Sequence, residues 1–397
     1  MIHIYPSKVK KADVIVGIPS YNEADSIEFV VKQIDLGLRK YFPNSKNVII
    51  NADNNSPDNT KKAFLRTKTT TPKTYISTQP GIRGKGNNLY NFFNKAVKMD
   101  GKIIIIIDAD LKSITPEWIK KLGKPIEKGY DYILPLYNRN EYDGSITNHL
   151  CYPLVYGILG IRIRQPIGGE FAFSRIFIDY ALKQNWTKNI KNYGVDIFLT
   201  LNAILGDFKI AQVDLESKIH KPSTPKLGPM FFQVADTCLR LITQNKKEWL
   251  KKIESHIPPT FYQIKQYSPP QKLSIDYKDL KQKSLYEFSL HYQTLKEHLS
   301  SAVYKKLEKM YFQEKTLNIG SGLWSKIVYE MLCTYDKSGS KMTIIRALRP
   351  LYFGRTVTFI KRTLELSSKE SEIKIQRQAE RFYKNRNYLL KKYKLGK

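Results

Sequence analysis

Cysteine is scarce in this sequence, and the three that occur lie far apart. Cys151, Cys238 and Cys333 are odd in number and include no CxxC pair. This argues against a disulfide framework and against a zinc knuckle, so we expect buried free thiols. Long apolar runs are missing as well. The longest one is far shorter than the roughly 20 residues that a membrane-spanning helix needs. We therefore expect no transmembrane segment.

The first residues lack the pattern of a secretory signal. Residues 1–6 have no basic head followed by an apolar core and a small-residue cleavage site. We therefore expect the chain to stay in the cytoplasm.

Acidic residues are outnumbered by basic ones. Asp and Glu total 36 against 66 for Lys and Arg, so the net charge is +30 and the protein should attract anions. Nucleic acid, anionic lipid and phosphorylated metabolites would all fit, but no RNP, KH or helix-turn-helix signature supports the first, and we expect no nucleic-acid partner. Basic residues spread over the whole chain, which favours a solvated lysine surface over one binding patch.

Five consecutive isoleucines at 103–107 end abruptly in Asp108-Ala109-Asp110. Such a stiff, entirely apolar run is typical of a central strand covered on both faces in a mostly parallel sheet. Open α/β sheets bind ligands at the carboxyl ends of their strands, where two carboxylates can surround a hard cation that carries phosphate oxygens. The alternative is that both aspartates cap the helix that starts near Pro116.

The first 227 residues alternate between strands and helices, which predicts an α/β, Rossmann-like and mostly parallel sheet. Buried strands are expected at 13–19, 47–53, 74–76, 103–107, 131–136 and 209–215, and helices at 27–38, 116–126 and 194–205. From about Gly228 glycine becomes sparse and helical spacing dominates. We therefore predict a catalytic domain over 1–227 and a helical region over 228–397, the latter for the acceptor side, for oligomerisation or for both.

The last segment, 367–397, is predicted to be a strongly basic helix with interleaved tyrosine and leucine. It could be a packed terminal helix with a snorkelling lysine face, or it could dock on a membrane surface. Peripheral membrane contact and a homodimer are both left open.

Several short motifs follow one another along the chain. They are Pro-x-x-Asn-Glu at 19–23, Asp-x-x-Ser-x-Asp-x-Thr at 53–60, Gly-Lys-Gly at 84–86, Asp-x-Asp at 108–110, Pro-x-Gly-Gly-Glu at 166–170, Gly-Val-Asp at 194–196 and a downstream His220. Their order over residues 13–240 resembles a GT-A glycosyltransferase, and more narrowly the glucosyl-3-phosphoglycerate synthases and mannosylglycerate synthases. Two departures, Asp53-Asn54-Asn55-Ser56 without a glycine and Arg83 before the Gly-Lys-Gly, leave the base preference open.

The resemblance implies a retaining, metal-dependent enzyme of compatible-solute synthesis. Such an enzyme moves glucose or mannose from an NDP-sugar to the 2-hydroxyl of D-glycerate or 3-phospho-D-glycerate. Negative charge grows on the departing nucleoside diphosphate, so the site needs a divalent cation, Mg²⁺ or Mn²⁺, and fixed positive donors. The candidate metal ligands are Asp110 and His220, while Asp108 would face the ribose or support the metal through water.

The remaining site residues also follow from the resemblance. Glu170 would hydrogen-bond hexose hydroxyls, and Asp196 would bind the hexose in a retaining enzyme or act as general base in an inverting one. Lys85 would reach a phosphate or the base edge. The catalytic candidates are Asp110, Glu170 and Asp196; the nucleotide-sugar candidates are Pro19, Tyr21, Glu23, Asp53, Gly84, Lys85, Asp108 and Ala109; the acceptor candidates are Gly168, Gly169 and Lys221. Lys226, Arg162 and Arg164 are further donors for an acceptor phosphate.

Two other functions remain open at this point. One is an inverting family-2-like transferase that acts on a lipid phosphate or a polysaccharide at an anionic membrane, as the generic motifs and the basic tail suggest. The other is a basic binding protein that has kept a nucleotide fold without catalysis. The intact Asp-x-Asp argues against the second.

Overall fold

The computed structural model describes residues 2–5, 9–221, 227–264, 267, 270, 273 and 276–394. The chain divides into two compact units. The sheet unit contains Met1–Arg139, Ile167–Lys226 and Pro258–Pro270, and the helical unit contains Asn140–Pro166, Leu227–Ile257 and Gln271–Lys397. This division differs from the predicted domains 1–227 and 228–397 in two segments, because 140–166 belongs with the later helices and 258–270 with the sheet.

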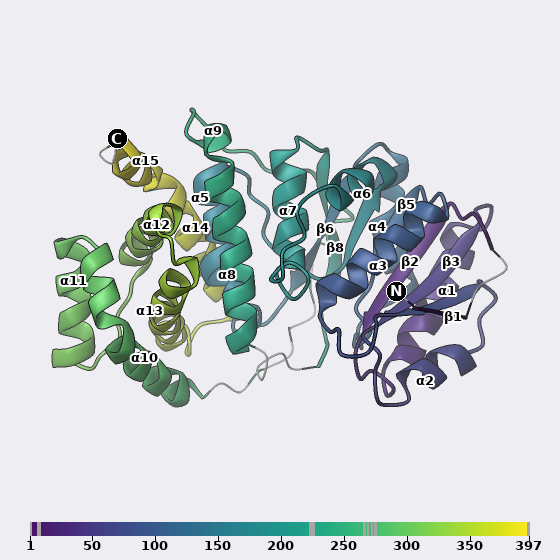
Figure 1. Ribbon diagram of the computed structural model, residues 1–397, viewed down its shortest axis with the longest axis horizontal. Helices are drawn as coiled ribbons and strands as arrows, with labels where there is room; N and C mark the ends of the chain where they lie inside the picture. The colour runs from purple at the N-terminus through teal and green to yellow at the C-terminus, as the bar shows by residue number, and fades with distance from the viewer. Residues whose placement is uncertain are drawn as a thin grey trace. The chain divides into compact units, whose positions relative to one another are not determined.

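The described part of the sheet unit holds one nine-stranded sheet in the order β1-β4-β3-β2-β5-β7-β6-β8-β9 (Figure 1). The strands are β1 (Ile2–Tyr5), β2 (Val14–Ser20), β3 (Asn47–Asp53), β4 (Lys73–Ser77), β5 (Ile103–Ile106), β6 (Tyr132–Asn138), β7 (Phe171–Ser174), β8 (Ile210–Ser217) and β9 (Thr260–Phe261). Most neighbouring pairs are parallel, and β1 and β7 are the antiparallel strands. The predicted α/β class with a mostly parallel sheet is confirmed.

The isoleucine run forms the centre of this sheet, as predicted. β5 lies between β2 and β7, and side chains alternate along it between the two faces. Ile103, Ile105 and Ile107 belong to the core beneath α1 and α4, so Ile104 and Ile106 point to the opposite face, where α3 covers the sheet (Figure 1).

The described residues of the sheet unit form six helices. They are α1 (Ile27–Tyr41), α2 (Thr60–Arg66), α3 (Lys85–Lys98), α4 (Pro116–Glu127), α6 (Arg175–Leu182) and α7 (Val195–Leu205). The predicted helices at 27–38, 116–126 and 194–205 correspond to α1, α4 and α7. The antiparallel strand β7 was not predicted, because its four residues follow directly on the glycine turn at 168–169 and are too few to display a period.

The helical unit is built around α13 (Lys341–Lys361), whose side chains are buried along most of its length. Helices α8, α10 and α12 pack against it, while α14 packs against α5 and α12 and reaches α13 through the Arg355–Gln378 hydrogen bond. The remaining elements are η1 (Thr147–Cys151), α5 (Tyr152–Leu159), α8 (Leu227–Gln244), α9 (Lys246–Trp249), α10 (Tyr277–His298), α11 (Ser301–Glu308), η3 (Lys309–Gln313), α12 (Ser321–Lys337), α14 (Ser368–Lys384) and α15 (Arg386–Lys394). The predicted helical region is confirmed, but the single basic helix expected over 367–397 is two helices that meet at Asn385.

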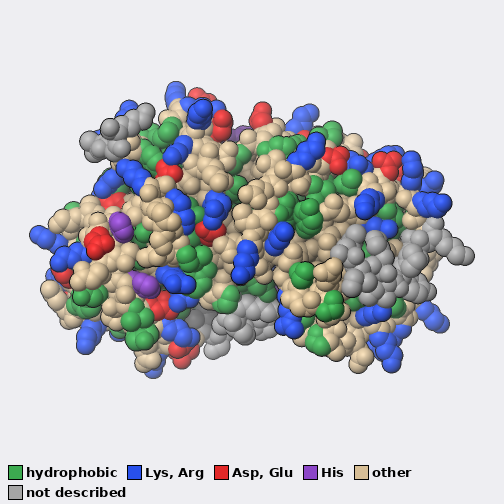
Figure 2. All heavy atoms as spheres, in the orientation of Figure 1, with side chains coloured by type: hydrophobic (Ala, Val, Ile, Leu, Met, Phe, Trp, Pro, Cys, Tyr) green, Lys and Arg blue, Asp and Glu red, His purple; other side chains and the backbone are tan. Residues whose placement is uncertain are grey.

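Three further expectations concern surface and interior. Cys151, Cys238 and Cys333 are buried free thiols, as expected. Lys and Arg side chains are scattered over the visible face instead of forming one block (Figure 2). In the described ranges, no helix combines the length and the apolar character that crossing a bilayer would require.

Candidate active site

Asp108 and Lys85 form an ion pair at the point where β5 ends. Asp108 continues the side of Ile104 and Ile106, which faces α3, and its Oδ1 lies 3.0 Å from the Nζ of Lys85, the first residue of α3. The alternative that Asp108 and Asp110 cap the next helix is wrong, because Thr115 is the N-cap of α4.

The two glycines beside Lys85 are required by the chain itself. A Cβ on Gly86 would lie 2.0 Å from the carbonyl oxygen of Ile190, and one on Gly84 would lie 2.4 Å from that of Lys191. The backbone amide of Gly86 also donates to the carbonyl of Asn192 at 3.0 Å. This close approach ties the start of α3 to the segment before α7, so that Lys85 Nζ comes within 3.4 Å of Asp196 Oδ2.

A second lysine, Lys218, completes the group and was not among the predicted site residues. Its Nζ lies 2.8 Å from Glu170 Oε2 and 3.6 Å from Asp108 Oδ2, and it donates to the carbonyl of Gly168 at 2.9 Å. We call Lys85, Asp108, Glu170, Asp196 and Lys218 the charged cluster. The only sequence signal for Lys218 was its position one residue after a strand, in a basic loop.

Gly169 allows the turn before β7 to approach the charged cluster closely. Its φ is +101°, and a Cβ there would lie 2.7 Å from Asp108 Oδ2 and 2.9 Å from Lys218 Nζ. A side chain would therefore separate the turn from the ion pair. Gly169 was predicted to bind the acceptor, which stays a prediction, and the structure places its backbone against the cluster.

Burial and the two lysines divide the three carboxylates. Burial raises the pKa of Glu170 to about 7, although Lys218 opposes the shift. Burial also raises the pKa of Asp196, against the attraction of Lys85. For Asp108 burial acts in the same direction, but Lys85 and Lys218 together outweigh it and lower its pKa. Asp108 therefore carries its charge throughout the physiological range, while Glu170 can gain a proton near neutrality.

Glu170 and Asp196 differ in how their oxygens are occupied. Glu170 is fully buried and accepts hydrogen bonds from Lys218 and from the Tyr137 hydroxyl, which sequence reasoning also missed. Asp196 Oδ1 is buried and has no hydrogen-bond partner in the part of the chain that the structure describes. A buried acceptor without a partner is costly, so this oxygen is suited to a donor from a ligand.

Glu23 and Lys221 form a neighbouring ion pair between the loops that follow β2 and β8. Lys221 Nζ lies 2.7 Å from Glu23 Oε2 and 2.7 Å from Asp25 Oδ1. Burial raises the pKa of Glu23, Lys221 opposes this, and the negative charge of Asp110 raises it further. The predicted acceptor residue Lys221 therefore lies beside a predicted nucleotide residue, and Asp110 is near enough to act on the same carboxylate.

Asp53 connects the end of β2, the turn at 53–60 and strand β4. It is fully buried and accepts from the Ser20 hydroxyl at 2.8 Å, the Ser56 amide at 2.7 Å and the Tyr75 hydroxyl at 2.7 Å. These bonds position the turn at 53–60, whereas its predicted contact with the nucleotide stays a prediction. Elsewhere in the sheet unit, the central carbon of the Arg83 guanidinium lies 4.8 Å from the centroid of the Tyr21 ring.

The predicted metal ligands lie on adjoining loops. The amide of Lys112 donates to the carbonyl of Ile219 at 2.8 Å, and the amide of Ile219 donates to the Ser113 hydroxyl at 2.9 Å. This places His220 beside the segment that follows Asp110. Among the described residues, no group of three or more His, Cys, Asp and Glu side chains could hold a metal alone. The predicted pair, Asp110 and His220, would supply two ligands. Mg²⁺ or Mn²⁺ can be held by one or two protein ligands together with waters and a diphosphate.

The other predicted residues are less informative. Pro19 pairs with Ala52 in the sheet and Ala109 is buried, so only their backbone could face a ligand. Arg164 forms a two-pronged ion pair with Glu372 inside the helical unit, where Arg162 also lies. Lys226 lies outside the described residues.

Comparison with known proteins gives a family match and several similar proteins. Residues 15–185 match the family described as glycosyl transferase family 2. A curated relative, the glucosyl-3-phosphoglycerate synthase of Petrotoga mobilis, is 28% identical over 182 residues, which are 42% of this chain and 53% of the relative. The chain thus spans about half the length of the curated relative that it matches.

Solved structures of glucosyl-3-phosphoglycerate synthase from Mycobacterium tuberculosis are also similar. The complex with Mn²⁺, UDP and phosphoglyceric acid is 25% identical, with a TM-score of 0.45, and covers 58% of this chain and 78% of that chain. The complex with Mg²⁺ and UDP is 25% identical, with the same TM-score, and covers 58% and 79%. By sequence, residues 15–185 are similar to glycosyl transferase family 2, and the chain resembles a glucosyl-3-phosphoglycerate synthase over part of its length.

Proposed function

We propose that this protein transfers a hexose from an NDP-hexose to the 2-hydroxyl of D-glycerate or 3-phospho-D-glycerate, with retention of anomeric configuration. The observation that carries the proposal is the charged cluster at the carboxyl end of β5. Three of its members, Lys85, Asp108 and Glu170, lie within the residues that match family 2. Its two largely buried lysines come from the start of α3 and from the residue that follows β8, and they meet at the same carboxylate, Asp108. The curated relative has a name that matches this reaction with glucose as the sugar.

The lysines supply the fixed positive charge that a departing nucleoside diphosphate requires. Lys85 lies at the first position of α3, so the partial positive charge of the helix N-terminus adds to its own. Asp108 and Asp196 hold its ammonium in place before substrate arrives. Charge that is positioned in advance stabilises a developing anion without reorganisation.

Asp196 is suited to bind the hexose. One of its oxygens is committed to Lys85, while the other is buried and available to a sugar hydroxyl. Glu170 accepts hydrogen bonds from Lys218 and from Tyr137, so it would act mainly by positioning Lys218. The predicted hydrogen bond from Glu170 to a hexose hydroxyl stays a prediction.

A divalent cation fits beside this cluster. Asp110 and His220 would hold Mg²⁺ or Mn²⁺, and the cation would neutralise the diphosphate charge. Glu23, whose pKa responds to Asp110, would contact the nucleotide, and Lys221 would hold Glu23 in position.

A matrix of donors and acceptors tests the proposal. Purified protein is incubated with Mg²⁺ or Mn²⁺, one of several NDP-glucoses or GDP-mannose, and glycerate or 3-phosphoglycerate, and NDP release is measured. At least one pair should turn over. No release with any pair, and no donor hydrolysis, would refute the assignment.

The variant Asp110→Asn separates metal-dependent turnover from general damage. It keeps the side-chain shape but removes the charge, so kcat should fall at least about 100-fold. Asp207→Asn is the matched control, because Asp207 is exposed and has a φ of +56° that asparagine accepts. Equal activity of the two variants would contradict the role of Asp110.

The inverting alternative is favoured by the match to family 2 and by the basic helices α14 and α15. In that case Asp196 would serve as general base, and the protein would bind anionic vesicles in a salt-sensitive manner. NMR of the product decides between them, since a β-linked product from an α-linked donor indicates inversion.

A further inference from the structure

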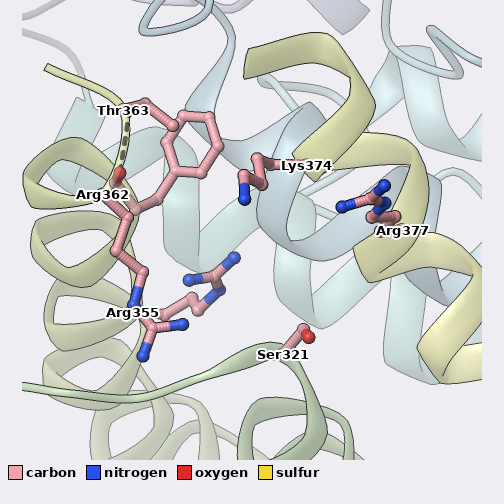
Figure 3. A pocket seen from close by; sticks show the side chains of 7 residues that line it. Ser321, Arg355, Arg362, Thr363, Lys374 and Arg377 are labelled. Atoms are coloured by element: carbon pink, nitrogen blue, oxygen red, sulfur yellow. Dashed lines mark hydrogen bonds between the residues drawn. The ribbon is translucent and has the colours of Figure 1, made fainter. Parts of the chain in front are cut away.

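A second cationic site lies within the helical unit, in a cavity of about 150 Å³ (Figure 3). Its lining residues come from the start of α12, the end of α13 with the residues that follow, and the middle of α14. They are Ser321, Arg355, Phe359, Arg362, Thr363, Lys374 and Arg377. Four of the seven are cations and none is acidic. No member of the charged cluster lines this cavity.

Arg355 is the feature that needs an explanation. Its side chain is 4% exposed, and its guanidinium donates to Gln378 Oε1 at 2.5 Å and to the Ile319 carbonyl at 3.3 Å. Both partners are neutral. Burial, together with the nearby charge of Arg362, lowers the pKa of Arg355 to about 9. Arginine is rarely buried without an acidic partner, because the lost hydration is then not replaced.

Among the described residues, the other three cations have no close acidic partner, although Lys374 is near enough to help lower the pKa of the exposed Glu370. Within the described residues, no ion pair joins Arg362, Lys374 or Arg377 to a carboxylate, and the Arg362 guanidinium donates to the Asn318 side-chain oxygen at 2.5 Å. In Figure 3 the Lys374 ammonium and the Arg355 guanidinium point into the same space from facing helices. Like charges repel, so this convergence is unfavourable while the space holds only water.

The walls offer neutral donors as well. Ser321 begins the 17-residue helix α12, whose first-turn amides lack partners within the helix and carry partial positive charge. Its hydroxyl is a further donor on the cavity wall. Planar guanidinium groups, an ammonium and a helix start form a donor set that matches the tetrahedral oxygens of a phosphate.

We propose that this cavity binds a phosphate group, either as the free ion or as the head of a small phosphomonoester. The bound dianion would give Arg355 the counter-charge that the protein does not supply, and it would connect α12, α13 and α14. Phosphate should therefore stabilise the helical unit as well as bind to it.

Binding is tested by isothermal titration calorimetry on the full chain, with inorganic phosphate in one arm and glycerol 3-phosphate in the other. The double variant Lys374→Ala/Arg377→Ala removes two exposed cations of the cavity and leaves buried Arg355 in place. Its Kd for the tighter ligand should rise at least about tenfold. A lower Kd for glycerol 3-phosphate than for phosphate would identify a phosphomonoester as the natural occupant, and the reverse would identify the free ion.

The matched control is Lys369→Ala/Arg381→Ala, which removes the same charges from exposed positions of the same helix that do not line the cavity. This control should bind phosphate with the same Kd as the wild type. Phosphate should raise the Tm of the wild type and of the control, but not the Tm of Lys374→Ala/Arg377→Ala. Equal Kd values for the two double variants would overturn the proposal, as would no wild-type binding up to roughly 10 mM of either ligand. These readouts need no transferase activity, so they can fail or succeed independently of the proposed reaction.

Discussion

Glu170→Gln should change the pH dependence of stability in a defined way. The folded protein holds a proton on Glu170 up to a pKa of about 7, whereas an unperturbed glutamate loses it near 4.5. Between these values the folded state binds more protons than the unfolded chain, so this group makes the protein less stable as the pH rises.

The interval from 4.5 to about 7 corresponds to about 3 kcal/mol, at roughly 1.36 kcal/mol for each pH unit. Glutamine has nearly the same shape, can still accept from Lys218 and does not titrate. The free energy of unfolding of the wild type, relative to that of Glu170→Gln, should therefore fall by about 3 kcal/mol between pH 4.5 and 7 and change little above pH 8.

The free energy of unfolding is measured by urea denaturation at several pH values, and unfolding is monitored by a spectroscopic signal from the sheet unit. Glu127→Gln is the control, since Glu127 is exposed and pairs with Lys124 on the surface of α4. Its difference from the wild type should stay nearly constant over the same range. Parallel profiles for Glu170→Gln and the wild type would refute the reasoning, because Glu170 would then titrate alike in the folded and unfolded states.

Two further predictions concern the residues around Asp108. Gly169→Ala should lower the free energy of unfolding by at least about 2 kcal/mol and abolish turnover, because its Cβ would collide with Asp108 Oδ2. Gly129→Ala is the control, because Gly129 has a φ of +84° but no atom within 4 Å of the new Cβ. It should lower the free energy of unfolding by only about 1 kcal/mol and keep activity. Equal losses of stability in the two variants would contradict the packing argument. Lys85→Met should reduce kcat about 100-fold in steady-state NDP release, while Lys98→Met, on the exposed end of the same helix, should leave kcat unchanged; a full-activity Lys85→Met would remove Lys85 from the site.

The sequence predicted the fold where local patterns were strong. The isoleucine run could only be a buried strand, since five stiff apolar side chains have no polar face to turn toward water. The alternation of strands and helices then indicated the parallel sheet. The antiparallel strand β7 escaped prediction because its direction depends on long-range pairing with β5 and β6, which four residues do not encode.

The candidate site divides in the same way. Asp108, Asp196, Glu170 and Lys85 were found because each lies in a short motif beside a strand or a helix start. Lys218 was missed because one lysine in a basic loop looks like many others in a chain of net charge +30. The predicted contact of Gly84 with the nucleotide-sugar stays a prediction, and the close approach that Gly84 and Gly86 permit to Lys191 and Ile190 was not predicted.

By itself, therefore, the sequence determined the buried strand, the carboxylates at its end and the glycines around them, because these depend on residues that are neighbours along the chain. Only the tertiary structure decided which charges meet. Lys218 with Glu170, and Arg355 with Lys374, are brought together by packing between distant segments. Their energies depend on burial and on a few ångströms of separation, which no local pattern records.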